Sequence, residues 1–132
     1  MINPSELRIG NYIEINRDQF AKVVTINGES AIVGITTRQN FYLTSSFIRG
    51  IELTPEWLER CGFKKVSDQD WDGPTIEHEN EIEYFSIREF GNGFYRLMGS
   101  EWPMGKPFQF VHQLQNLFYC HAEEELTIKD HA

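Results

Sequence analysis

Cysteine is scarce in this chain. The 132 residues contain only Cys61 and Cys120, which are far apart and form no Cys-x-x-Cys pattern. A disulfide-stapled fold is therefore not expected. No apolar run approaches the roughly 18 residues needed to span a bilayer, and residues 1–6 lack the basic and apolar regions of a secretory signal. These absences predict a cytoplasmic protein that does not associate with membranes.

Basic residues are in the minority, with 12 Lys and Arg against 20 Asp and Glu and a net charge of −8. Direct nucleic-acid binding is not expected, because phosphate recognition needs a basic surface. Residues 1–53 contain five bases and five acids, whereas residues 54–132 contain seven bases and fifteen acids, so the whole excess lies in the second part. The apolar fraction of 40% is typical of a globular chain and excludes a disordered one.

Residues 1–53 carry strand patterns and no helix pattern. Apolar and β-branched residues mark strands over 7–15, 20–26 and 31–35, and Asn27-Gly28 between the last two is typical of a two-residue type I′ hairpin turn. Further strands are expected over 41–43 and 47–53. Several short strands in about fifty residues predict a small SH3-like β-barrel or curled sheet over 1–53.

Residues 54–132 mix helix and strand patterns. Thr54 and Pro55 can begin a helix and Gly62 can end it. The expected elements, in order, are a helix over 55–61, a strand over 63–66, a hairpin over 82–98 that turns at 91–93, a loop over 99–109 with Pro103, Gly105 and Pro107, a helix over 110–121 and a strand over 126–128. The predicted fold class is α+β, with the N-terminal β-region packed as one compact unit on a C-terminal sheet with two helices.

The segment 68–79 fits the spacing of an EF-hand calcium loop. Asp68, Asp70 and Asp72 would supply oxygen ligands, Gly73 the sharp turn and Glu79 the closing bidentate carboxylate. The flanking sequence is strand-like, although an EF-hand needs helices there. A solvated acidic loop is therefore the alternative to a calcium site. No other cofactor is predicted.

The helix expected over 110–121 lacks the charges of an ordinary solvent-facing helix. No Asp, Glu, Lys or Arg occurs from Pro107 to Ala122. Its apolar stripe is predicted to comprise Phe110, Leu114, Leu117 and His121, widened by Val111 and Phe118. The other face carries amides, imidazole and phenol, which indicates either a contact surface for a partner, a second subunit or the N-terminal region, or capping of the chain's own backbone. An internal interface is favoured, and the candidate partner-binding residues are His112, Gln115, Asn116 and Tyr119, with Trp102 in a preceding loop.

Four stretches resemble a known family. They are Glu6-Leu7-Arg8-Ile9-Gly10-Asn11-Tyr12; Leu53-Thr54-Pro55-Glu56-Trp57-Leu58 with Cys61-Gly62-Phe63; Val111-His112-Gln113-Leu114-Gln115-Asn116-Leu117-Phe118-Tyr119; and Glu124-Glu125-Leu126-Thr127. Together they are similar to an uncharacterised family of small proteins from Bacteroidetes-type gut bacteria, often encoded in prophages or mobile elements. The resemblance implies a genomic setting and a whole-chain architecture, and it brings no activity or catalytic residue.

Three functions remain open from the sequence. The first is a non-catalytic protein-binding accessory module of phage or mobile-element origin, which binds a protein partner or a second copy of itself. The second is an acidic mimic of nucleic acid, in which the acids of 68–83 occupy the basic groove of a DNA-binding protein. The third is calcium binding through 68–79. An enzyme is not expected, because no nucleophile–base pair can be assembled from the sequence.

Overall fold

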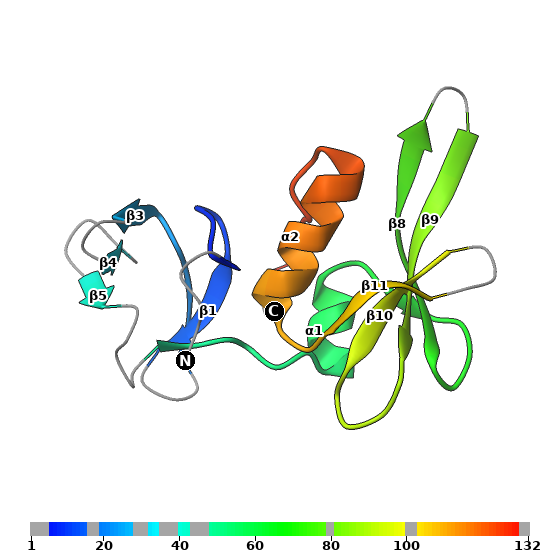
Figure 1. Ribbon diagram of the computed structural model, residues 1–132, viewed down its shortest axis with the longest axis horizontal. Helices are drawn as coiled ribbons and strands as arrows, with labels where there is room; N and C mark the ends of the chain where they lie inside the picture. The colour runs from blue at the N-terminus through cyan, green and yellow to red at the C-terminus, as the bar shows by residue number, and fades with distance from the viewer. Residues whose placement is uncertain are drawn as a thin grey trace. The chain divides into compact units, whose positions relative to one another are not determined.

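The computed structural model describes residues 6–15, 19–27, 32–34, 40–42, 48–78, 81–99 and 103–129. It shows an α+β protein (Figure 1). In chain order the elements are β1 (Tyr12–Ile15), β2 (Gln19–Lys22), β3 (Thr25–Asn27), β4 (Ile32–Gly34), β5 (Asn40–Tyr42), β6 (Ile48–Arg49), α1 (Pro55–Arg60), β7 (Lys64–Lys65), β8 (Asp70–His78), β9 (Glu81–Glu89), β10 (Tyr95–Met98), β11 (Pro103–Phe108) and α2 (Val111–Ala122). No helix in these ranges is long and apolar enough to cross a membrane.

The chain divides into two compact units. The first comprises residues 1–52 and 110–116, and the second comprises 53–109 and 117–132. The division falls one residue before the predicted boundary at 53/54. The first half of α2 belongs to the first unit, although the sequence pattern assigns the whole helix to the C-terminal region.

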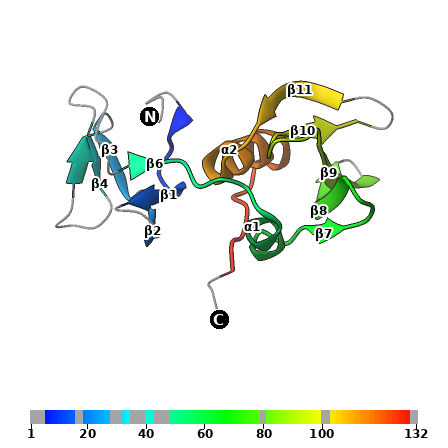
Figure 2. The same cartoon turned by 90° about the horizontal axis from the view of Figure 1, so that it is seen from below.

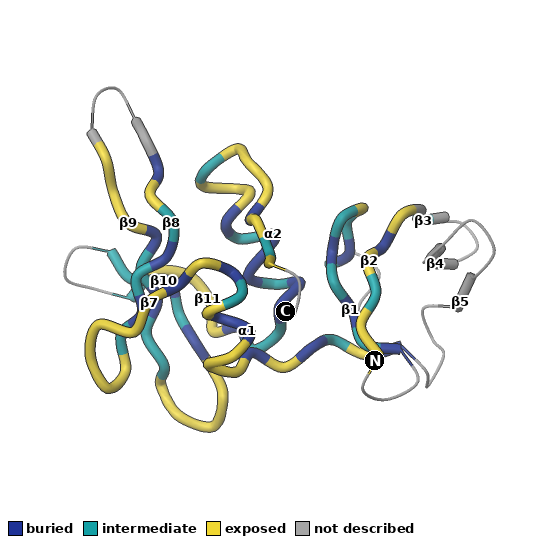
Figure 3. Tube along the Cα trace, turned by 180° about the vertical axis from the view of Figure 1, so that it is seen from behind, coloured by how far each residue is buried: buried dark blue, intermediate teal, exposed yellow. Residues whose placement is uncertain are grey.

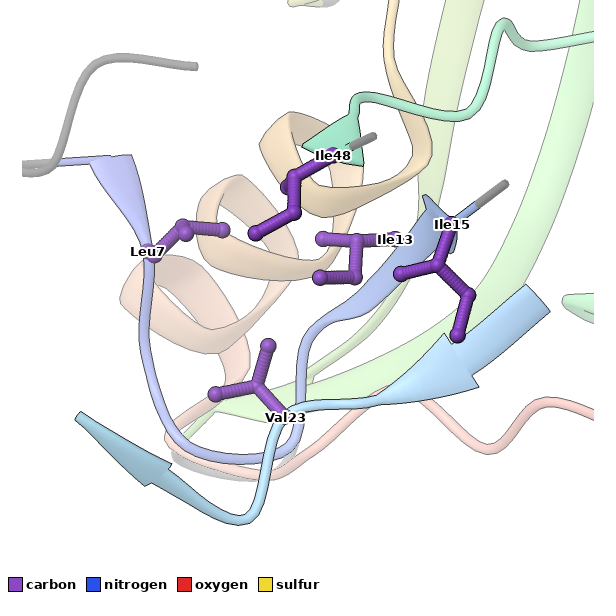
Figure 4. Packing of buried hydrophobic residues seen from close by; sticks show 5 residues of the cluster. All are labelled: Leu7, Ile13, Ile15, Val23 and Ile48. Atoms are coloured by element: carbon purple, nitrogen blue, oxygen red, sulfur yellow. The ribbon is translucent and has the colours of Figure 1, made fainter. Parts of the chain in front are cut away.

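The first unit contains two antiparallel three-stranded sheets, with the orders β2-β1-β6 and β3-β4-β5. Leu7, Ile13, Ile15, Val23 and Ile48 pack together as its apolar core (Figure 4). Each is at most 7% exposed. Full burial of such a side chain stabilises a fold by about 1.5–3 kcal/mol, so this cluster is a main source of the unit's stability.

One prediction for the first unit is not confirmed and another is wrong. Among the described strands no sheet closes on itself, so the SH3-like barrel is not confirmed. The strand predicted over 20–26 is divided between β2 and β3, which belong to different sheets. Asn27 pairs with Ile32 and therefore lies within β3, so it is not a central residue of a two-residue turn. The β3–β4 pairing itself agrees with the predicted hairpin.

The second unit is built on one antiparallel sheet with the order β11-β10-β9-β8-β7 (Figure 2). The Thr54 side chain caps α1 by accepting a hydrogen bond from the Trp57 N–H at 3.3 Å. The β9–β10 hairpin turns through Gly91, Asn92 and Gly93, all with positive φ. Both features agree with the sequence analysis, because capping and left-handed turn residues act over only a few positions.

Two elements of the second unit were predicted wrongly. The expected loop around Pro103 and Pro107 contains the strand β11, which lies at the edge of the sheet, where proline removes no hydrogen bond that the sheet needs. The strand expected over 126–128 is not formed. Leu126 is nevertheless buried, and Lys129 and Arg60 exchange two hydrogen bonds, which attach this segment to the end of α1.

Gly73 marks an irregularity inside β8. The register with β9 shifts between Asp72 and Thr75. A Cβ atom at Gly73 would lie 2.5 Å from the Phe63 ring and 2.8 Å from the carbonyl oxygen of Phe85. Glycine is therefore needed here for close packing, whereas the sequence analysis gave it the turn position of a calcium loop.

Candidate functional site

Gln115 is the centre of a buried polar network in the first unit. Its side chain is 2% exposed. Its Oε1 accepts a hydrogen bond from the Tyr12 N–H at 2.8 Å, and its Nε2 donates to the Gly10 carbonyl at 3.1 Å. One side-chain amide thus pairs with the backbone of two alternate residues, as a neighbouring strand would.

Two asparagines extend this network. Asn11 is fully buried; its Oδ1 accepts a hydrogen bond from the Arg8 N–H at 2.6 Å, and its Nδ2 donates to Asn116 Oδ1 at 2.9 Å. The Arg8 Nε donates to the same Asn116 oxygen at 2.7 Å, and Asn116 Nδ2 donates to the Glu6 carbonyl. Buried polar groups that are paired in this way fix one arrangement of the chain, because any unpaired member would be costly.

His112 lies beside the network and is 1% exposed. Its ring stacks on Phe110, with centroids 5.7 Å apart, and its Nε2 lies 3.4 Å from a Glu6 carboxylate oxygen. Burial lowers the pKa of the imidazole, and Glu6 opposes this shift only in part. The ring Nδ1 is buried and has no hydrogen-bond partner among the described residues. Gly50 lies against the stack, since a Cβ there would come within 2.8 Å of Phe110.

The predicted partner-binding residues therefore have different positions. Residues 6–12 of the first unit interact with the side chains of His112, Gln115 and Asn116. These contacts correspond to the internal interface favoured from the sequence. The polar atoms that make them are not available to an external partner. Tyr119, in the second unit, is 42% exposed. Trp102 lies outside the described residues.

The apolar stripe of α2 is displaced from the predicted one. Val111, Leu114, Gln115 and Phe118 face inward with His112, whereas His121 is exposed and Leu117 is half-buried. The prediction of His121 as a stripe residue is wrong. The apolar periodicity could not predict that the polar residue Gln115 faces inward. Its amide is accommodated there because it forms hydrogen bonds with the backbone of Tyr12 and Gly10.

The EF-hand geometry is not formed by the described part of 68–79. Residues Asp70–His78 are the strand β8, paired along β9, so their backbone does not curl around an ion. Asp70 accepts hydrogen bonds from Arg88 at 2.6 and 3.3 Å, and Asp72 accepts one from Ser86 at 2.7 Å. Asp68 is exposed, and Glu79 lies outside the described residues.

The surroundings of the Asp70 carboxylate also differ from those of a calcium ligand. The hydrogen bonds from Arg88, and then that from Ser67, lower the pKa of its carboxyl group. Both of its oxygen atoms have partners of the chain's own. Across the described ranges no three His, Cys, Asp or Glu residues converge on a common point that could hold a metal ion.

Among the described residues of the second unit, the large apolar side chains of greatest exposure lie on the β8–β9 hairpin. Ile82 is 65% exposed and Tyr84 is 63% exposed. They alternate with Phe85 and Ile87, which are buried on the opposite face of β9, where Phe85 packs edge-on against Phe118 of α2 at 5.2 Å. The part of β9 before Ser86 pairs with β8 alone, because the β9–β10 pairing begins at Ile87. We call β8 and β9 together the arm. Figure 1 shows the arm, and Figure 3 shows the exposed residues of β9 in yellow.

An open pocket of about 480 Å³ lies beside this arm, within the second unit. Side chains of β8, β9, β10 and β11 line it together with His121 of α2. His121 also packs edge-on against Phe85, with ring centroids 6.0 Å apart. The pocket and the exposed arm are thus adjacent features of the second unit.

The two cysteines differ in exposure, since Cys61 is buried and Cys120 is exposed. Both are free thiols. Cys61 is fully buried, and burial raises its pKa to about 12, so its nucleophilic thiolate form is suppressed. Cys61 therefore packs as a small apolar group of the core.

No protein family, curated protein or solved structure matches this chain.

Sequence reasoning missed several residues that organise these sites. Asn11 and Arg8 complete the Gln115 network, and the only sequence signal was the set of uncharged polar residues on the helix that needs partners. Ile82 and Tyr84 were missed because the alternation in β9 places apolar side chains on both of its faces.

Proposed function

We propose that this protein is a non-catalytic binding module that engages a protein partner through the arm formed by β8 and β9. The exposure of Ile82 and Tyr84 carries the proposal. Large apolar side chains at such exposure are typical of interface anchors, since their burial against a partner is favourable. Tyrosine is especially common at interfaces because its ring is apolar and its hydroxyl can remain hydrated.

The charge of the arm favours a partner other than a second copy of the chain. Residues 70–89 contain seven acids and one base, Arg88, which is paired with Asp70. A symmetric dimer through this face would bring two acidic strands together, and like charges in close contact are unfavourable. A partner with a basic surface would be attracted instead.

The genomic setting and the finer architecture rest on the sequence. The resemblance to small prophage-encoded proteins supports an accessory role in phage or mobile-element biology, in the cytoplasm. The short β-strands of residues 1–53 support an SH3-like first unit.

Paired surface variants test the proposed function. Ile82→Ser with Tyr84→Ser should abolish capture of a host protein that the wild type retains, and should weaken binding of that purified protein about tenfold or more. The matched control is Ile9→Ser with Val66→Ser, which removes apolar side chains of 62% and 57% exposure elsewhere. Equal binding by the arm variant and the control would refute the proposal.

Acidic mimicry of nucleic acid is the second candidate, favoured by the concentration of acids on an extended arm. It predicts a DNA-binding partner and an affinity that falls steeply with ionic strength. Contacts through Ile82 and Tyr84 predict an affinity that changes little between low and high salt. A salt titration of the reconstituted complex distinguishes these two modes.

A further inference from the structure

The pocket beside the arm has an apolar wall. Leu97 and Met98 of β10, Met104 of β11 and Phe85 of β9 contribute to it. Thioether and aromatic groups are polarisable and accommodate flat ligand groups of varied shape. The pocket therefore favours an occupant with a flat or extended apolar portion.

The charged groups of the pocket are of one sign. Asp72 and Glu83 line it, and no Lys or Arg does. Glu83 lies two positions from Phe85 on β9, so the two side chains project from the same face of the strand. Glu83 is exposed and faces Ile76 across the β8–β9 pair. The Glu83 carboxylate thus lies at the border of an apolar hollow.

The arginines of the second unit are engaged elsewhere. Arg60 lies over the Trp57 ring at 4.0 Å, Arg88 is paired with Asp70, and Arg96 donates to the Gly105 carbonyl at 2.8 Å. The first of these contacts shows a guanidinium resting on an aromatic face in this same unit.

We infer that the pocket binds an arginine side chain of the protein partner. This deepens the proposed function and rests on it. The guanidinium plane would pack against the accessible part of the apolar wall, Met98 and Met104, while its N–H groups donate to Glu83. Arginine suits this geometry better than lysine, because its planar, weakly hydrated cation combines stacking with paired hydrogen bonds to a carboxylate.

Methyl NMR of the full chain labelled with [13C-methyl]methionine tests this inference. Millimolar arginine methyl ester at pH 8 should shift the methyl signals of Met98 and Met104. Citrulline methyl ester, which keeps the shape of the side chain and lacks the charge, should shift them far less. Glu83→Gln should weaken arginine binding about fivefold, whereas Glu59→Gln, an equal charge change at an exposed residue of α1, should leave it unchanged.

The outcomes separate this inference from the proposed function. Absence of shifts with arginine, equal shifts with citrulline or lysine methyl ester, or an unaffected Glu83→Gln variant would each overturn the arginine pocket. The pocket is supported, and the partner-binding arm refuted, if arginine binds as expected while Ile82→Ser with Tyr84→Ser leaves the partner complex intact.

Discussion

Replacement of Gln115 by leucine should destabilise the first unit by about 2–4 kcal/mol. The leucine keeps the apolar volume but removes the acceptor of the Tyr12 N–H and the donor to the Gly10 carbonyl. A buried polar group that loses its partner costs about 1–3 kcal/mol. Because Tyr12 and Gly10 are themselves half-buried, the lower half of that range applies to each.

Urea unfolding followed by far-ultraviolet circular dichroism measures this cost, because the signal reports both units. With a denaturant slope of about 2 kcal/mol/M, the midpoint should fall by about 1–2 M. Gln19→Leu, an exposed glutamine of β2 in the same unit, should change stability by less than about 0.5 kcal/mol. If Gln115→Leu and Gln19→Leu have the same urea midpoint, the network around Gln115 does not stabilise the fold.

Three further perturbations follow from the structure. Burial lowers the pKa of His112 in the folded chain from 6.5, so as the pH decreases below 7 the unfolded chain binds a proton at this residue first. The free energy of unfolding should therefore decrease as the pH decreases, and His112→Gln should reduce the change in the urea midpoint between pH 7.5 and 5. An equal change in the variant and the wild type would contradict this reasoning. Gly73→Ala should lower stability by about 1–3 kcal/mol through its contact with the Phe63 ring, and an unchanged thermal melt would disprove that packing. Millimolar calcium should leave the melting temperature as it is in chelator, because Asp70 is bonded to Arg88; a rise would restore the calcium site.

Features of the fold that depend on neighbouring residues could be predicted from the sequence. The cap at Thr54, the helix over Pro55–Arg60 and the turn at 91–93 each follow from residue types a few positions apart. The β11 strand could not be predicted, because its prolines are compatible with an edge strand only once the order of the sheet is known.

The candidate sites depended on contacts between distant residues and were predicted less well. The uncharged helix face indicated buried polar contacts, but the partners of Gln115 are more than a hundred positions away in the sequence. The acidic spacing of 68–79 matched a calcium loop because a strand can carry the same residue types at the same intervals. Only the pairing of β8 with β9 separates the two structures.

The most direct test of the binding module is site-specific photocrosslinking from Tyr84. A photoreactive phenylalanine analogue placed there should crosslink in host cells to one protein. The purified protein should then bind the wild type and the Ile9→Ser, Val66→Ser control, and should bind the Ile82→Ser, Tyr84→Ser variant at least about tenfold more weakly. The account would be contradicted if no crosslink formed at Tyr84, or if the crosslinked protein bound the arm variant as tightly as the wild type.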